Sequence, residues 1–132
     1  LAISGRCYHA RLHDRMKDAC QFVCGEDPDG RDVATLDGQP FLAVNGVQTL
    51  SQSTASMAHR VETLAEAGVA SLRLSPQSQG FGRICAFYAD RLAGRLTAPA
   101  LEALLRPMVP GQRLSDGFPA GPSGAAWSGA MA

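Results

Sequence analysis

The spacing of the cysteines constrains this chain more than any other feature of its sequence. Three of the four lie within the first 24 residues, as Cys7, Cys20 and Cys24 in the pattern C-x12-C-x3-C, while Cys85 lies far away in a helical pattern. Disulfide frameworks belong to small secreted domains, whereas an uneven cluster in a chain without a visible secretory leader is more typical of a metal site. We therefore predict that the three clustered thiols bind a metal and that Cys85 belongs to a helix core.

The segment from Ser4 to Asp32, which carries these cysteines, is polar, rich in charge and short of aliphatic periodicity. It predicts a long ordered loop, and ordered loops of that length are usually functional. Backbone amides of such a loop can donate hydrogen bonds to metal-bound sulfurs. The neighbouring Arg6, Arg11 and Lys17 would favour the thiolate form and offset the negative charge of a cluster.

Spacing alone leaves the identity of the metal open. The pattern matches neither the tight ferredoxin run nor paired C-x2-C zinc knuckles. An iron–sulfur cluster held by cysteine usually needs four thiolates. A structural zinc site with His9 or His13 as the fourth ligand is an alternative, because three cysteines and one histidine form a closed tetrahedral set. Three unrelated buried thiols are the third alternative.

The remaining sequence predicts an α/β fold with parallel strand pairing. Turn, cap and periodicity signals predict the following elements: a hairpin of Val33–Leu36 and Pro40–Val44 around Asp37-Gly38, a strand Val47–Leu50, a helix after Ser51 or Ser53, a strand Val69–Leu74, a helix Gln79–Leu92 with Phe81, Ile84, Cys85, Tyr88 and Leu92 buried, and a helix opening at Thr97 that buries Leu101, Leu104 and Leu105. Two such units are too few to close a barrel, so we expect them to complete a sheet begun upstream.

Three segments are expected along the chain. Residues 1–32 form the cysteine-rich loop, residues 33–109 the last βα units, and residues 110–132 a tail rich in glycine, proline, serine and alanine, anchored only by Phe118 and Trp127. Lysine plus arginine equals aspartate plus glutamate at 12 each, so no net field attracts nucleic acid. No apolar run is long enough to span a bilayer, and we expect a cytoplasmic protein.

Two stretches carry a more specific signal. ISGRCYHARLHDRMKDACQFVCGEDPDG (Ile3–Gly30) resembles the collagenase-like peptidase family and, within it, the UbiV branch of oxygen-independent ubiquinone-biosynthesis accessory proteins. TLDGQPFLAVNGVQTLS (Thr35–Ser51) and LRLSP (Leu72–Pro76) resemble the same branch. The resemblance covers residues 1 to about 105. It implies the C-terminal portion of a (β/α) barrel-like fold with an inserted cysteine-rich loop and a β-hairpin.

The resemblance also implies a cofactor and partners. Cys7, Cys20 and Cys24 would correspond to three ligands of a [4Fe–4S] cluster, with the fourth ligand outside this sequence. The activity it implies is oxygen-independent hydroxylation of the ring in ubiquinone biosynthesis, as a heterodimer with a sister subunit of the same family. A quinone precursor would be the substrate, and prephenate is the candidate oxygen donor.

Six further residues are candidates for binding substrate or supporting the cluster: Arg6, His9, Lys17, Asn45, Gln48 and Arg73. Arg73 could fork around a carboxylate such as that of prephenate, although a surface or salt-bridging arginine is an equally good interpretation. His9 could relay protons or bind substrate, and an ordinary hydrogen-bonded loop histidine is an equally good interpretation. The catalytic residues themselves are not indicated by any motif.

Other classes of function receive less support. No Ser-His-Asp set, H-E-x-x-H helix or G-x-S-x-G elbow favours proteolysis. A family relative that hydroxylates RNA nucleotides would need a basic stripe that the balanced charge does not provide. A non-catalytic scaffold pinned by zinc is the remaining alternative.

Overall fold

The computed structural model describes residues 2–109, 111, 113–117 and 121, which mix helices with strands. The chain divides into two compact units, one up to Gln52 and one from Ser53 onward. The segment from Ser4 to Asp32, called the cysteine segment below, therefore lies in the same unit as the hairpin. The division into three segments expected from the sequence stays a prediction.

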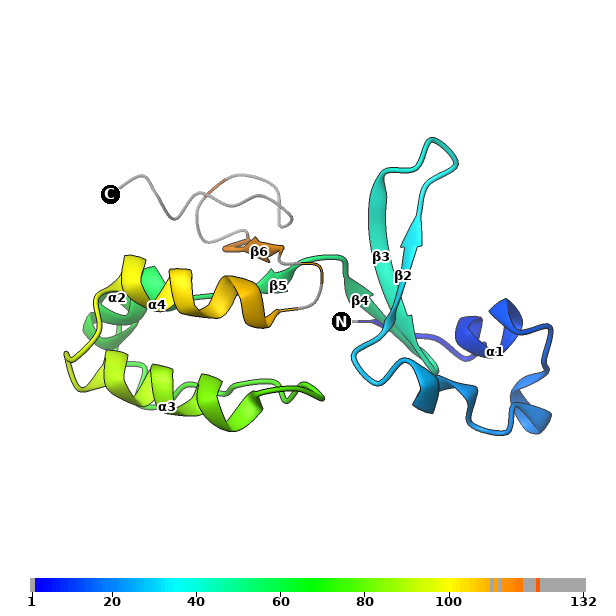
Figure 1. Cartoon of the computed structure of the whole chain (residues 1–132), viewed down its shortest axis with the longest axis horizontal. Coiled ribbons are helices and arrows are strands. Elements are labelled where there is room, and N and C mark those ends of the chain that lie inside the picture. Colours follow the sequence, from blue (N-terminus) through cyan, green and yellow to red (C-terminus); the bar gives the residue numbers. More distant parts are fainter. Residues whose placement is uncertain (1, 110, 112, 118–120, 122–132) are drawn as a thin grey trace. The chain divides into compact units, whose positions relative to one another are not determined.

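The first unit is built on a four-stranded antiparallel sheet with strand order β1-β4-β3-β2 (Figure 1). Its strands are β1 (Ala2–Ile3), β2 (Arg31–Ala34), β3 (Pro40–Asn45) and β4 (Gln48–Ser51). The predicted parallel pairing is wrong for this sheet, and among the described strands only β5 and β6 of the second unit pair in parallel. Because β1 pairs with β4, the sheet joins the start of the unit to its end. The backbone N–H of Ser4 donates to the Val47 carbonyl at 2.9 Å just beyond that pair.

The predicted hairpin is confirmed as the pair β2–β3. The Asp37-Gly38 dipeptide forms its tip, where Gly38 adopts a φ of +80° that favours glycine over any side chain. The Thr35 hydroxyl donates to the Asp37 carboxylate within this tip. The predicted strand Val47–Leu50 is confirmed as β4, shifted by one residue.

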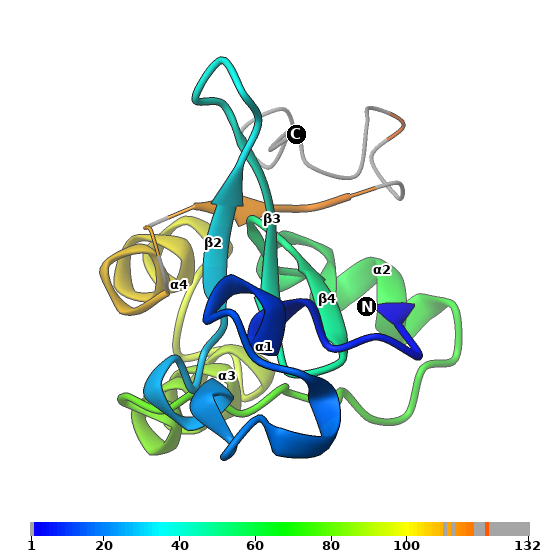
Figure 2. The ribbon, with the colours of Figure 1, turned by 90° about the vertical axis from the view of Figure 1, so that its right-hand side faces the viewer.

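The segment predicted as one long loop contains short helices. They are α1 (Tyr8–Leu12) and two 3-10 turns, η1 (Lys17–Ala19) and η2 (Val23–Glu26). Helix α1 packs against β3 and against η2 (Figure 2). Its Ala10 is fully buried, so a short helix that lacked a recognisable periodicity is stabilised by packing on the sheet.

The second unit has a small α/β core. Its elements are β5 (Thr54–Ala55), η3 (Ala58–Arg60), α2 (Val61–Glu66), α3 (Phe81–Leu92), α4 (Ala98–Leu105), η4 (Arg106–Met108) and β6 (Leu114–Ser115). Helices α3 and α4 pack against each other (Figure 1), and β5 pairs in parallel with β6. The core consists of Ala58, Ile84, Tyr88, Leu101, Leu105, Val109 and Leu114.

Two helix predictions in this unit are confirmed. The periodic segment Gln79–Leu92 forms α3 from Phe81 onward. Thr97 caps α4, because its side chain accepts a hydrogen bond from the Ala100 N–H at 3.4 Å. The expected burial holds for Ile84 and Tyr88.

The helix predicted to begin after Ser51 or Ser53 starts later. The strand β5 intervenes, and helical structure begins only with η3 at Ala58 and continues in α2. Ser53 is buried instead of capping a helix. The serine caps were a local signal that strand pairing with β6, about 60 residues away in the chain, overrode.

The predicted strand Val69–Leu74 is also wrong. Residues 69–74 form neither strand nor helix and are largely exposed. A strand is stable only with a hydrogen-bonded partner, and among the described residues none pairs with this run. Its apolar composition was therefore insufficient to define an element.

Cys85 does not belong to the helix core. Its side chain is exposed on α3, as is that of Leu92, whereas Arg91 on the same helix is buried. In α4, Leu104 is likewise partly exposed, while Leu101 and Leu105 are buried. Each helix therefore buries a narrower face than the one predicted from the spacing of its apolar residues, because Cys85, Leu92 and Leu104 lie outside it.

The segment predicted as a tail contributes to the second unit where it is described. Leu114 and Ser115 form β6, and they are buried together with Asp116. The predicted anchors Phe118 and Trp127 lie outside the described residues. No helix in the described part of the chain is both long and apolar enough to cross a membrane.

Candidate metal-binding sites in the first unit

Cys7 is held at the start of α1. Its sulfur caps the helix by accepting a hydrogen bond from the Ala10 N–H at 3.3 Å, and its side chain is buried. The cap fixes the side chain in a position set by the backbone of α1. The thiol that opens the sequence motif is therefore an ordered sulfur with an amide donor.

Cys20 and Cys24 lie in the two turns that follow. The Cys20 sulfur accepts a hydrogen bond from the Phe22 N–H at 3.4 Å, and Cys24 lies within η2. Both are half-buried, and neither forms a disulfide. Amide hydrogen bonds to sulfur are a feature of iron–sulfur ligation. By donor type, three free thiols, two of them with amide donors, suit such a cluster, whereas the group of ligand atoms that lie together in the described residues is His9, His13 and Asp27 and includes no cysteine.

The backbone between these two cysteines is in an unusual conformation. Gln21 and Phe22 both have φ of 54°, in the left-handed region that bulky residues rarely adopt. Phe22 is also largely exposed, so burial of its ring does not stabilise this conformation. Strained residues of this kind concentrate at functional sites, where the surrounding structure holds them.

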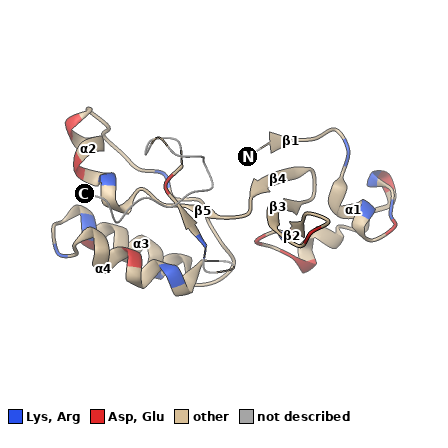
Figure 3. Ribbon diagram, turned by 90° about the horizontal axis from the view of Figure 1, so that it is seen from above, with Lys and Arg blue, Asp and Glu red and all other residues tan. Residues whose placement is uncertain are grey.

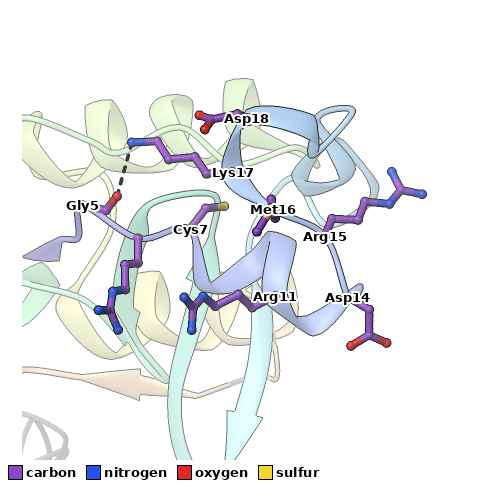
Figure 4. A pocket seen from close by; sticks show the side chains of 9 residues that line it. Gly5, Cys7, Arg11, Asp14, Arg15, Met16, Lys17 and Asp18 are labelled. Atoms are coloured by element: carbon purple, nitrogen blue, oxygen red, sulfur yellow. Dashed lines mark hydrogen bonds between the residues drawn. The ribbon is translucent and has the colours of Figure 1, made fainter.

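A cavity of about 520 Å³ lies beside Cys7 (Figure 4). Its lining includes four cationic side chains and two carboxylates: Arg6, Arg11, Arg15, Lys17, Asp14 and Asp18. Figure 4 shows Cys7 between Lys17 and Arg11 in this view. The Lys17 ammonium donates to the Gly5 carbonyl at 3.3 Å and Arg15 donates to the Cys20 carbonyl at 3.1 Å. The excess of cations gives this cavity a local positive charge, although the whole chain has no net charge. Figure 3 shows basic (blue) and acidic (red) positions interspersed around α1.

Asn45, a candidate from the sequence, ties the segment after Cys24 to the sheet. Its side-chain amide donates to the Asp27 carbonyl at 2.7 Å and also approaches the carbonyls of Pro28 and Cys24 at 3.3 and 3.5 Å. It stands at the end of β3, next to the turn at Gly46, where an added Cβ would lie 3.8 Å from the Cys24 sulfur. Asn45 therefore positions the cysteine segment.

His9 is fully buried, which the sequence did not indicate. Its Nδ1–H donates to the Val44 carbonyl at 3.2 Å, and its Nε2 lies 3.2 Å from Asp27 Oδ2. The His13 ring stacks on that of His9, with centroids 5.5 Å apart. One ligand atom from each of His9, His13 and Asp27 lies within 4.8 Å of the other two. The i, i+4 spacing of the histidines could have indicated this pair, although the sequence prediction treated them as alternative zinc ligands, and Asp27 joins them only through the fold.

The other candidates do not join this arrangement. Gln48 is exposed on β4, opposite Asn45 in the strand register. Arg73 belongs to the second unit, where it is exposed and lines a separate cavity of about 370 Å³. Arg6 contributes to the basic cavity and is itself exposed.

The second unit contains a polar cluster that no motif in the sequence indicates. His59 lies between two carboxylates, with Nδ1 3.6 Å from Glu102 and Nε2 3.4 Å from Asp116. Burial raises the pKa of Glu102 above its ordinary value, an effect that His59 partly opposes. The three residues come from η3, α4 and the segment after β6, so sequence spacing could not group them.

Comparison with known proteins adds no family: no protein-family model matches the chain, and no solved structure matches it.

Proposed function

We propose that this chain belongs to an iron–sulfur subunit for oxygen-independent hydroxylation of the ring in ubiquinone biosynthesis, similar to the UbiV branch of the collagenase-like peptidase family. Cys7, Cys20 and Cys24 supply three ligands of one [4Fe–4S] cluster, and the fourth ligand lies outside this sequence. In this proposal the subunit is cytoplasmic and works with a sister subunit of the same family. In this proposal the second unit belongs to the C-terminal portion of a (β/α) barrel-like fold, into which the cysteine-rich loop and the antiparallel β2–β3 hairpin are inserted.

The surroundings of the thiols support the proposal. Three free thiols lie in one compact unit, and two of their sulfurs accept amide hydrogen bonds. A basic cavity adjoins Cys7. A cluster with cysteine thiolates carries net negative charge, which nearby cations offset. The cluster supplies one-electron chemistry when bound. The chain's own residues order the sulfurs, and the four cations around Cys7 give the cavity the charge that a carboxylate donor such as prephenate requires.

The test is the metal and sulfide content of the full-length protein purified without oxygen. We expect about four irons and four sulfides per chain, with a broad visible absorption that bleaches on reduction. Cys20→Ala should lose iron, sulfide and colour together. Cys85→Ala is the matched control, because that thiol is exposed on α3 in the other unit and should retain the full content.

Full iron and sulfide in Cys20→Ala would refute the ligand assignment. Zinc in place of iron would refute the cluster and favour the scaffold alternative. Loss of ring hydroxylation in an anaerobic assay with the sister subunit, parallel to loss of the cluster, would connect the site to the reaction.

A further inference from the structure

We propose that His9, His13 and Asp27 form a second, mononuclear site for a divalent transition metal, Zn²⁺ or Fe²⁺, separate from the cysteine thiols. The ligand atoms are His9 Nε2, His13 Nε2 and Asp27 Oδ2. The inference goes beyond the proposed function and does not depend on the cysteines binding a cluster. Three observations about these atoms support it.

The first observation is that all three atoms are buried and lack a hydrogen-bond partner. His9 Nε2 and Asp27 Oδ2 lie 3.2 Å apart but are not aligned for a hydrogen bond, and His13 Nε2 is likewise unpartnered. Burying polar atoms without partners costs free energy. Three such atoms in one place indicate a missing common partner, and a cation satisfies all of them.

The second observation is the tautomer of His9. Its Nδ1 must carry the proton, because the Val44 carbonyl 3.2 Å away can only accept. In a neutral ring this leaves a lone pair on Nε2, which can act as a metal ligand. Nε2 lies 3.2 Å from Asp27 Oδ2 with no aligned hydrogen bond between the two atoms, so one cation can accept an electron pair from each of them. A backbone carbonyl that orients a histidine through its other nitrogen is also the usual arrangement at metal sites.

The third observation is the geometry of the ligand set. Nitrogen and oxygen ligands lie about 2.1 Å from zinc, which separates two ligands of one ion by roughly 3 to 3.5 Å. The His9–Asp27 pair already has this separation. Two histidines and one carboxylate leave coordination positions open, as in zinc hydrolases and non-heme iron enzymes.

The surroundings hold the three ligands in place. The Asp27 carbonyl accepts from the Asn45 amide at 2.7 Å and from the Gly30 N–H at 2.9 Å, so the residue is pinned through its backbone. Arg31 approaches Asp27 Oδ2 only to 3.7 Å and is half-exposed, so its guanidinium can turn toward solvent when an ion binds. The side-chain carboxylate therefore remains available as a ligand.

The experiment titrates the full-length protein with Zn²⁺, and separately with Fe²⁺ without oxygen, and reads the stoichiometry and affinity by calorimetry. We expect one site per chain in addition to any cluster iron. His13→Gln and Asp27→Asn should each weaken binding by at least about tenfold, a loss that even removal of an outer partner causes at metal sites. The Cys20→Ala protein should still bind the ion at this site. The metal site and the proposed iron–sulfur cluster can therefore be refuted independently of each other.

Matched controls and a spectroscopic readout distinguish this site from the cysteine thiols and from surface carboxylates. His59→Gln removes a histidine that faces two carboxylates in the other unit, and Asp18→Asn removes an exposed carboxylate, so both should bind as the unchanged protein does. Co²⁺ in the site should give weak visible bands without the intense near-ultraviolet charge transfer that thiolate ligands produce. Asp27→Asn retains the backbone carbonyl, so circular dichroism should show an unchanged fold.

The proposal is overturned if neither ion binds, or if His13→Gln and Asp27→Asn bind the ion as tightly as the controls do. Thiolate-to-cobalt charge transfer in the single strong site would also overturn it, because the cysteines would then be the ligands.

Discussion

Substitution of Asn45 tests whether the sheet positions the cysteine segment. The amide of Asn45 has two N–H groups. The nitrogen donates to the Asp27 carbonyl at 2.7 Å and makes longer contacts to the carbonyls of Pro28 and Cys24 at 3.3 and 3.5 Å. A net hydrogen bond in a protein contributes about 1 kcal/mol. Asn45→Ala should therefore lower the free energy of unfolding by about 2 kcal/mol, because two donors are lost.

Asn45→Asp should cost more than the alanine, although it is nearly isosteric. A carboxylate only accepts hydrogen bonds, so its oxygens would face the carbonyl oxygens of Asp27 and Pro28 at close range. The order of stability is expected to be Asn, then Ala, then Asp. A steric role for the side chain would instead make Asp the milder substitution.

The assay is urea unfolding of the metal-free protein, with iron and sulfide content after anaerobic reconstitution as the second readout. Gln48→Ala is the control, since this neighbour in the strand register is exposed and surface substitutions usually change stability by within about 0.5 kcal/mol. If Asn45→Ala unfolds as the control does and reconstitutes fully, the carbonyl contacts do not hold the segment and the reasoning fails.

Two further predictions concern the second unit. Leu101→Ala should reduce the free energy of unfolding by about 2–5 kcal/mol, because this side chain is fully buried, whereas Leu104→Ala on the same helix should change it far less; equal losses in urea unfolding would contradict the packing described. The raised pKa of Glu102 gives its protonated form a stabilising contribution that is present below the ordinary value of 4.5 and lost as pH rises through the folded-state pKa. Stability of the unchanged protein relative to Glu102→Gln should therefore fall as pH rises through that window, and a pH-independent difference would show that burial does not control this group.

Much of the local structure could be predicted from the sequence. The tip of the β2–β3 hairpin was recognisable because Asp37-Gly38 meets the backbone requirement of a tight turn by itself. Helix α4 was recognisable because Thr97 caps it and Pro99 fits its first turn. These features depend on residues within a few positions of one another.

The features that were missed depend on distant partners. Strand β5 exists because Thr54 pairs with Leu114, which local serine caps could not reveal. The run from Val69 to Leu74 had the composition of a strand but no described partner. Cys85 was predicted to be buried from its place in a helical pattern with Ile84 and Tyr88, whereas the side chain is exposed on α3.

In the candidate sites, too, local features could be predicted from the sequence, whereas contacts between distant residues could not. The three cysteines and the neighbouring cations follow from sequence proximity, and the fold keeps them in one unit. The link from His9 to Asp27, and the role of Asn45, depend on β3 passing beside the cysteine segment. An asparagine that ends a strand does not reveal which carbonyls its amide will meet.

The pairing of β1 with β4 has a consequence for how this unit tolerates change. The backbones at Ser4 and Val47 are joined by a hydrogen bond of 2.9 Å, so the stretch between them, which includes β2 and β3, begins and ends at one place. A segment that starts and finishes at one place can be lengthened or shortened without moving what flanks it, and doubling such an excursion costs only about 0.6 kcal/mol in closure entropy. The exposed hairpin tip near Leu36 is where natural variation in length, or a grafted peptide tag, would be absorbed with the least effect on the ligands.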